Sequence, residues 1–154
     1  MTQTEKMDKA AILHVPLSQY AFATSEYTIT IRLRAKKSDL TRCVLYTADR
    51  VCRTTPICFA GTDMKICAVD ECFEYYEANL QLPYNRICYY FKLEKGKEWT
   101  YYYADRFTKE LPDRVVDGKL IDGRSEYYQY PFILRDEIPD VPEWFKEAVV
   151  YNIF

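Results

Sequence analysis

The sequence predicts an all-β fold, an immunoglobulin-like antiparallel β-sandwich. Aromatic residues make up 16% of the 154 residues and 15 residues are Tyr, a composition that favours strands over helices. Several short segments alternate apolar and polar side chains, which is the period of a half-buried strand. Turn signals separate these segments at short intervals, as they do in sandwiches. A chain of this length is about one domain and can bury its own core.

The first predicted strand has the most regular pattern in the chain. Tyr27–Arg34 alternates apolar and polar side chains without interruption. We therefore expect a half-buried strand with an apolar face made of Tyr27, Ile29, Ile31 and Leu33. Residues 35–39 form a charged turn, and a second strand is expected over Arg42–Thr47.

Further strands are predicted along the middle of the chain. Residues 52–63 contain Pro56 and Gly61, so they are expected to form a loop or an irregular edge. Lys65–Val69 is expected to be a strand. Residues 71–82 are also assigned to a strand, because they show no helical 3.6-residue stripe, and a turn at 82–85 follows them.

The clearest hairpin joins Arg86–Leu93 to Glu98–Ala104 through a turn at residues 94–97. Two Asp-Gly pairs, at 117–118 and 122–123, then mark a loop. Tyr127–Leu134 is expected to be a last aromatic strand. About six to eight short strands of this kind complete the sandwich, with under about a tenth of the residues in helix.

Composition excludes several classes of protein. The formal net charge of −2 lacks the basic excess of a nucleic-acid binder. No apolar run approaches the roughly 18–20 residues of a membrane span, so no membrane partner is expected. The first ten residues are polar and carry no apolar signal region, which predicts a cytoplasmic protein.

Six Cys residues could form three disulfides, but a reducing cytoplasm favours free thiols. No Cys-x-x-Cys pair occurs, and His14 is the only His, so neither a metal site nor a catalytic thiol is expected. We expect no cofactor. Most Cys residues are expected to be small core side chains on strands, and His14, in an apolar segment, to be a hydrogen-bonded structural residue.

The C-terminal segment has a different character. Residues 139–147 read as a linker that runs into one helical turn, with Pro142 suited to its start. Residues 149–154 read as an apolar strand, and domains rarely end on one because its edge invites aggregation. We therefore expect a β-sandwich over 1–138, followed over 139–154 by a linker and the start of a truncated domain. The linker turn is expected to pack Trp144 back against the sandwich.

The C-terminal residues 141–154 read VPEWFKEAVVYNIF. They are similar to the entry into the catalytic barrel of cyclomaltodextrinases, neopullulanases and maltogenic amylases, which are enzymes of the α-amylase family, glycoside hydrolase family 13. Other segments resemble the N-terminal domain of the same enzymes, in the same order: His14-x-Pro16, Tyr20-Ala21-Phe22, residues 31–37, Ala48-Asp49-Arg50, residues 70–75 and the Tyr-rich strand 87–91. The similarity covers nearly the whole chain.

The resemblance implies a family-34 carbohydrate-binding module, a β-sandwich that precedes a catalytic (β/α)-barrel. It implies α-glucan partners (starch, cyclodextrin, pullulan), the chain's own barrel, and a second subunit in a homodimer. It also implies that the catalytic carboxylates of the family lie beyond residue 154. Some relatives place an aromatic residue after Ala-Asp-Arg, near sugar bound by the partner subunit. This sequence has Val51 there, so the resemblance does not extend to that contact.

Sugar binding needs flat aromatic faces that cover a glucose ring, with polar groups nearby. The candidate residues on or near turns are Tyr20, Trp99, Tyr101, Tyr102 and Tyr103. Strand alternation places Tyr101 and Tyr103 on one face and Tyr102 on the other, so at least one of the three is expected to be exposed. The alternative is that these rings are core and cross-strand packing residues.

Carboxylates are numerous but do not form a convincing catalytic pair. A glycosidase needs two carboxyl groups about 5–10 Å apart across a cleft. The candidates are Asp136, Glu137 and Asp140, Asp113 with Asp117, and Glu71 with Glu74, all expected to be solvated surface groups. Two other hypotheses stay open beside sugar binding: a purely structural domain without sugar affinity, and a self-sufficient enzyme, which the missing catalytic residues disfavour.

Overall fold

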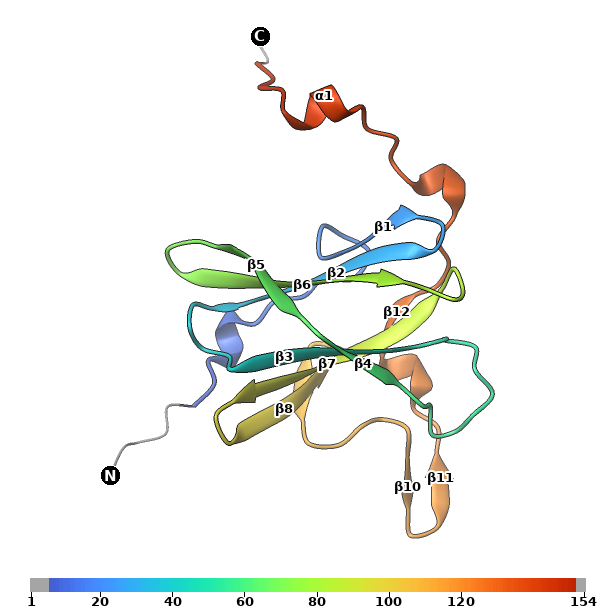
Figure 1. The fold of residues 1–154 in the computed structure, drawn as a ribbon. Helices are drawn as coiled ribbons and strands as arrows, with labels where there is room; N and C mark the ends of the chain where they lie inside the picture. Colours follow the sequence, from blue (N-terminus) through green and yellow to red (C-terminus); the bar gives the residue numbers. More distant parts are fainter. Residues whose placement is uncertain (1–5, 152–154) are drawn as a thin grey trace, which may run out of the picture.

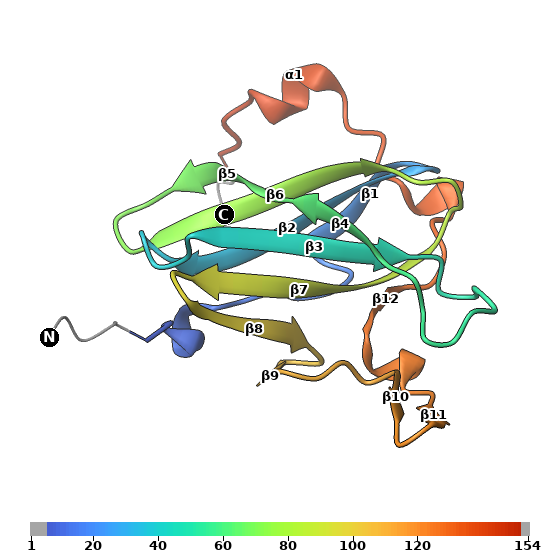
Figure 2. The same ribbon diagram turned by 60° about the horizontal axis from the view of Figure 1, so that its bottom comes forward.

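The computed structural model describes residues 6–151. These form two antiparallel sheets packed as a β-sandwich and a separate two-stranded sheet (Figures 1 and 2). The strands are β1 (Ala21–Ser25), β2 (Thr28–Lys36), β3 (Arg42–Ala48), β4 (Ala60–Asp63), β5 (Lys65–Val69), β6 (Phe73–Gln81), β7 (Ile87–Lys95), β8 (Glu98–Tyr103), β9 (Arg106–Thr108), β10 (Arg114–Val116), β11 (Lys119–Ile121) and β12 (Tyr128–Tyr130). About 9% of the structure is helical. The predicted fold class is confirmed.

One sheet has the strand order β1-β2-β6-β5. Strands β2 and β6 pair over their whole length, from Thr28 opposite Gln81 to Lys36 opposite Phe73. The inward face of β2 carries Ile29, Ile31 and Leu33, all fully buried, as the alternation predicts. The expectation for Tyr27 is wrong: it precedes β2 in the turn after β1 and is exposed.

The second sheet has the order β4-β3-β7-β8-β9, and β12 also pairs with β7. Strand β7 lies at its centre, with β3 on one side and β8 followed by β12 on the other. The β7–β8 hairpin closes on Gly96, whose φ of +57° is a backbone conformation that Gly adopts without strain. The predicted hairpin is confirmed, and β4 supplies the irregular edge expected near residue 60.

An aromatic core fills the space between the sheets. Tyr89 and Phe91 of β7 are fully buried and pack around His14, with ring centroids 5.5 and 4.8 Å from the imidazole. The His14 ring contacts the Arg32 carbonyl through Nδ1 at 2.7 Å and the Tyr89 hydroxyl through Nε2 at 2.9 Å. The expected structural role of His14 is confirmed, since the ring ties both sheets together.

The region after β9 departs from the prediction in two places. The predicted loop with Asp117-Gly118 contains a hairpin, in which β10 and β11 pair around a turn where both residues have positive φ. This hairpin projects from the body of the sandwich (Figure 1). The last strand is also shorter than expected, because β12 ends at Tyr130 and Pro131 follows, which has no N–H to donate.

Three single-turn 3-10 helices, η1 (Lys9–Ala11), η2 (Arg124–Glu126) and η3 (Arg135–Glu137), and one short α-helix, α1 (Glu143–Lys146), complete the described chain. Pro142 immediately precedes α1 as its N-cap. Between residues 6 and 151, no helix is long and apolar enough to cross a membrane.

The expected packing of Trp144 is wrong. Its side chain is 70% exposed, and its only ring contact within the described residues is with Phe145, the next residue along the chain. Val149, Val150 and Tyr151 belong to no strand and are exposed. The rest of the predicted terminal strand, 152–154, lies outside the described residues. The proposed domain boundary after residue 138 stays a prediction.

Candidate functional site

The five aromatic residues selected from the sequence occupy two different environments. Three of them, Tyr20, Tyr102 and Tyr103, are buried. Tyr20 and Tyr102 belong to the aromatic core around His14 and Tyr128, and the Tyr103 hydroxyl donates to the Glu110 carbonyl at 2.9 Å. Covered rings offer no face to a sugar. Trp99 and Tyr101 are half-buried, and of the three consecutive tyrosines only Tyr101 has accessible surface of this extent.

Trp99 and Tyr101 lie together on β8, on the side of the second sheet opposite to the paired residues Phe91 and Tyr102. Their rings pack edge to face with centroids 5.1 Å apart. Tyr101 also meets Tyr90 of β7 edge to face at 5.4 Å, and Tyr90 stacks on Tyr46 of β3 at 5.0 Å. Alternation along each strand directs these four rings to the same side of the sheet. We call Tyr46, Tyr90, Trp99 and Tyr101 the outer aromatic face.

Cations surround the indole of Trp99. The Lys109 ammonium lies 4.0 Å from the ring centroid and the Lys92 ammonium 5.3 Å from it. Lys109 also donates to the Trp99 carbonyl. The Lys92 ammonium bonds Glu94 at 2.9 Å, and this hydrogen bond raises the pKa of Lys92 above its usual value. Cation–π contacts of this kind hold the lysines over the ring, so a sugar has to displace at least one of them.

The hydroxyl groups of the buried tyrosines stay protonated in the physiological range. Burial raises the pKa values of Tyr89, Tyr90 and Tyr128 well above the usual value of 10. The Tyr89 and Tyr128 hydroxyls therefore act as neutral hydrogen-bond partners inside the fold. Tyr90, the buried member of the outer aromatic face, supplies no charge to it.

The carboxylates selected from the sequence differ in their burial. Asp136, Glu137, Asp140, Asp117 and Glu71 are exposed, as expected of solvated groups. The expectation is wrong for Asp113 and Glu74, because both are buried. Asp113 accepts from the Ile57 amide at 2.6 Å and from the Tyr127 hydroxyl, and Glu74 accepts from the Tyr76 hydroxyl at 3.3 Å. Each of the two buried carboxylates is thus used to hold structure.

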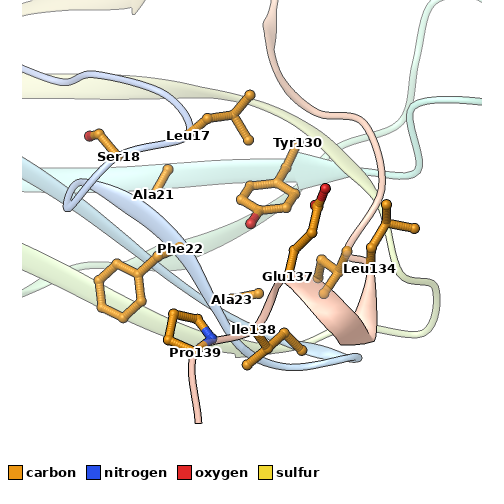
Figure 3. A pocket seen from close by; sticks show the side chains of 11 residues that line it. Leu17, Ser18, Ala21, Phe22, Ala23, Tyr130, Leu134, Glu137, Ile138 and Pro139 are labelled. Carbon is orange, nitrogen blue, oxygen red and sulfur yellow. The ribbon is translucent and has the colours of Figure 1, made fainter. Parts of the chain in front are cut away.

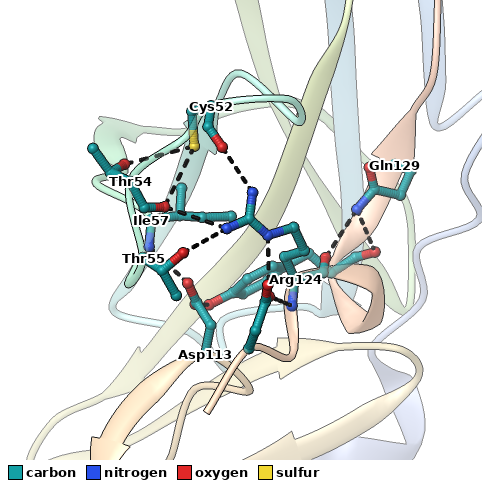
Figure 4. Close-up of polar contacts among 9 residues, drawn as sticks. Cys52, Thr54, Thr55, Ile57, Asp113, Arg124 and Gln129 are labelled. Atoms are coloured by element: carbon teal, nitrogen blue, oxygen red, sulfur yellow. Dashed lines mark hydrogen bonds and ion pairs between the residues drawn. The ribbon is translucent and has the colours of Figure 1, made fainter. Parts of the chain in front are cut away.

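Asp113 belongs to a polar network that fixes the loop after β3 (Figure 4). Arg124 donates to the Cys52 carbonyl at 2.7 Å and to the Thr55 hydroxyl at 2.7 Å. Asp113 accepts from the Ile57 amide of the same loop. Charge-assisted hydrogen bonds are among the stronger ones in proteins. The network therefore holds the loop that presents Val51, whose side chain is exposed.

The thiols differ from the prediction. Only Cys43 and Cys88 are buried, on β3 and β7, whereas Cys52 is half-buried and Cys58, Cys67 and Cys72 are exposed. The expectation of mostly buried thiols is therefore wrong, because Cys52, Cys58 and Cys72 lie in loops and Cys67 lies on β5, an edge strand exposed on both faces. All six thiols are free, and residues 6–151 contain no group of three ligating side chains that could hold a metal ion.

A groove of about 420 Å³ runs between β1 and the segment that carries η3 (Figure 3). Its walls are mainly apolar, with Phe22 and Ala23 on one side and Leu134 and Ile138 on the other. Tyr130 and Glu137 line it together and interact electrostatically. The groove contains few polar groups for a hydroxyl-rich ligand.

Tyr84 is an exposed aromatic residue that the sequence analysis did not select. It follows Pro83 in the turn between β6 and β7, and half of its surface is accessible. An aromatic side chain next to Pro in a predicted turn is the signal that could have identified it, because turns lie on the surface.

Comparison with known proteins identifies a family and several relatives. The family model "Alpha amylase, N-terminal ig-like domain" matches residues 7–134. Neopullulanase 2 of Thermoactinomyces vulgaris is 34% identical over 152 residues, which cover 94% of this chain and 23% of that protein. A cyclomaltodextrinase of Bacillus sp is 30% identical over 144 residues, 94% of this chain and 24% of the relative.

A solved cyclomaltodextrinase structure superimposes with a TM-score of 0.74 at 28% sequence identity, covering 92% of this chain and 22% of that chain. The chain thus spans about a quarter of the length of the curated relatives it matches.

Proposed function

Because the chain belongs to the family of alpha-amylase N-terminal ig-like domains, we propose that it is a non-catalytic module that binds α-glucans and contributes to a dimer. Its parent in this proposal is a glycosidase of the neopullulanase and cyclomaltodextrinase type, which hydrolyses O-glycosyl bonds. Its partners are α-glucan oligosaccharides or cyclodextrins, the catalytic barrel of the same protein and a second subunit. The proposed compartment is the cytoplasm. Nucleic acid and membranes are not among the proposed partners.

The single observation that carries the sugar-binding proposal is the outer aromatic face. Rings of Trp99 and Tyr101 stay partly accessible on a rigid sheet, and flat rings are what cover the apolar face of a sugar. Relatives named as acting on cyclodextrins and pullulan support the choice of α-glucans. The structural hydrogen bonds of the buried carboxylates Asp113 and Glu74 support a binding role over catalysis.

A second candidate function is a purely structural domain that orients the barrel and the dimer. The lysines over Trp99 favour it, because they already occupy part of the surface that a sugar would cover. The structural role predicts no saturable sugar binding by the isolated chain, whereas the binding role predicts it.

Calorimetric titration of the chain with β-cyclodextrin and maltotriose tests the proposal, with cellotriose as a control sugar of different linkage. Saturable heats for the α-linked sugars alone support a binding module. Flat titrations for all three sugars reject binding and leave the structural role. Sedimentation of the same sample as a function of concentration tests whether the chain associates on its own.

A further inference from the structure

One end of the sandwich opens into a cleft of about 290 Å³ that lies apart from the outer aromatic face. Its lining includes Thr47 at the end of β3, Thr62 of β4, Gln81 at the end of β6, and Asp49, Tyr84 and Arg86 in the flanking loops. Strands β3 and β4 belong to one sheet and β6 to the other, so the cleft lies where the two sheets part. Its volume is near the lower end of the roughly 300–1,000 Å³ range of ligand pockets. We call it the Tyr84 cleft.

The turn that presents Tyr84 is anchored on both sides. The Leu82 amide donates to the Tyr27 carbonyl at 2.7 Å, and the Ile133 amide donates to the Asn85 carbonyl at 2.7 Å. Pro83 restricts the backbone between these anchors. Because little backbone freedom is lost when a ligand meets such a turn, the Tyr84 ring is a preorganised contact surface.

A half-buried ion pair stands beside this ring. Arg86 donates to both carboxylate oxygens of Asp49, at 2.8 and 3.2 Å, and its guanidinium lies 5.2 Å from the Tyr84 ring centroid. The hydrogen bonds from Arg86 lower the pKa of Asp49, so both groups stay charged. Their charges cancel. The Tyr84 cleft therefore suits a neutral ligand with hydroxyl groups rather than a phosphate or a carboxylate.

The cleft also contains polar groups with unused hydrogen-bonding capacity. Within residues 6–151, the Thr47 and Thr62 hydroxyls make no hydrogen bond, although both reach accessible surface. Gln81 accepts from the Thr28 hydroxyl at 3.2 Å through its carbonyl oxygen, which leaves its amide N–H groups without a bond in the same part of the chain. These groups line the cleft near the ring of Tyr84.

We propose that the Tyr84 cleft binds one terminal ring of an α-glucan, with the sugar stacked on Tyr84 and its hydroxyls bonded by Asp49, Arg86, Thr47, Thr62 and Gln81. A sugar has an apolar face that stacks on an accessible aromatic ring. Its hydroxyl groups bond to planar charged groups and free hydroxyls beside that ring. The cleft is small, so it accepts the end of a chain and not its middle. This inference rests on the proposed α-glucan binding and assigns it to a different place.

The two surfaces differ in what a sugar must displace. Trp99 carries two ammonium groups over its indole, whereas half of Tyr84 is open and a single guanidinium lies over its ring. Cations already in place cost affinity if they must move. The Tyr84 cleft is accordingly the stronger site of the two.

The test is a titration of the full chain with maltotriose, followed by ¹H–¹⁵N NMR shifts, on Tyr84→Ala, Tyr84→Phe and Trp99→Ala. Tyr151→Ala is the matched control, because Tyr151 is also exposed but lies far along the sequence in the C-terminal segment. We expect shifts to cluster at residues 47–49, 62 and 81–87. Tyr84→Ala should weaken binding about three- to tenfold, which corresponds to the worth of an aromatic contact. Tyr84→Phe and Tyr151→Ala should bind like the unmodified chain.

The outcomes separate the site from the function. Weakening by Tyr84→Ala alone, with recovery in Tyr84→Phe, supports the Tyr84 cleft and excludes misfolding as the cause. Weakening by Trp99→Ala with full affinity in Tyr84→Ala overturns the inference but leaves α-glucan binding in place. No binding by the unmodified chain rejects the proposed function itself, and the inference with it.

Discussion

At the scale of single residues, His14 shows how burial sets chemistry. Its Nδ1 faces the Arg32 carbonyl, an acceptor, so Nδ1 carries the proton and Nε2 accepts from the Tyr89 hydroxyl. Burial lowers the pKa of His14 from 6.5 to about 4, while the bond to Arg32 and the charge of Asp105 oppose that change in part. The imidazole is thus a neutral connector between the sheets.

This pKa predicts how stability depends on pH. The pKa of His14 is lower in the folded chain than in the unfolded chain, so the His14 imidazole binds a proton more tightly when the chain is unfolded. The shifted pKa of His14 adds about 3 kcal/mol to the free energy of unfolding. This stabilisation is complete above about pH 6.5 and is lost as the pH falls toward about 4. Urea unfolding of the unmodified chain and of His14→Gln at pH 7 and 4.5 measures it. Between pH 7 and 4.5, the free energy of unfolding of the unmodified chain should fall by about 2 kcal/mol more than that of His14→Gln. Equal losses in the two chains would contradict the assignment.

Asp113 makes a second prediction at this scale. Asp113→Ala removes the acceptor of the Ile57 amide and of the Tyr127 hydroxyl, both in a buried environment. Unsatisfied buried donors are expensive, so the free energy of unfolding should fall by about 2–4 kcal/mol. Asp117→Ala, at an exposed turn, is the control and should change it by less than about 0.5 kcal/mol. Thermal or urea unfolding of the two variants decides whether Asp113 holds the loop.

The thiols give a third prediction. Burial raises the pKa of Cys43 and takes that of Cys88 to about 12, so neither forms thiolate readily in the folded chain. Cys58, Cys67 and Cys72 are exposed and should react with a thiol reagent within minutes at neutral pH, whereas Cys43 and Cys88 should react only on unfolding. Mass spectrometry of the modified chain identifies the sites. Rapid modification of Cys88 in the native state would argue against its burial.

The sequence predicts some of these residue roles and not others. His14 lies in an apolar segment, and burial follows from that context. The partners of Asp113, Tyr127 and Ile57, lie 14 and 56 residues away, so no local pattern predicts its burial. Glu74 bonds Tyr76, two residues along the same strand, but a charged side chain in a sequence gives no sign of its own burial. For the same reason, the sequence could not tell which of the neighbouring tyrosines keep an open face.

At the scale of elements, the strands with strict alternation were predictable, because one buried face fixes both the period and the register. Strand β2 and the β7–β8 hairpin are the clearest examples. The β10–β11 hairpin was missed although Asp117-Gly118 is a strong hairpin signal. Its flanking segments are only three residues each and carry exposed aliphatic side chains, so no alternating pattern marks them.

The C-terminal segment carries apolar side chains that do not pack against the sandwich. Its single helical turn forms where Pro142 predicts a start, yet its aromatic side chains stay on the surface. Trp144→Ala should therefore change the free energy of unfolding by less than about 0.5 kcal/mol. Deletion of residues 149–154 should leave the melting temperature nearly unchanged and reduce self-association, which light scattering measures. A large loss of stability in either variant would show that the segment belongs to the core.

At the scale of the whole molecule, two sheets around an aromatic core make a rigid support with accessible surface at the outer aromatic face and at the Tyr84 cleft. Within the described residues, the buried carboxylates Asp39, Glu74 and Asp113 are engaged in structural bonds. The purified chain should release no reducing sugar from cyclodextrin, pullulan or starch, because a glycosidase needs two carboxyl groups facing one cleft. Hydrolysis that copurifies with this chain through several columns would contradict that.

The most direct test of the account is an NMR titration of the chain with maltotriose, a linear α-linked glucan, with cellotriose as the β-linked reference. A non-catalytic α-glucan module predicts shifts that saturate, occur only with the α-linked sugar and leave that sugar intact at the end of the titration. A spectrum unchanged up to millimolar sugar would contradict the central claim, and the chain would then be a structural domain alone.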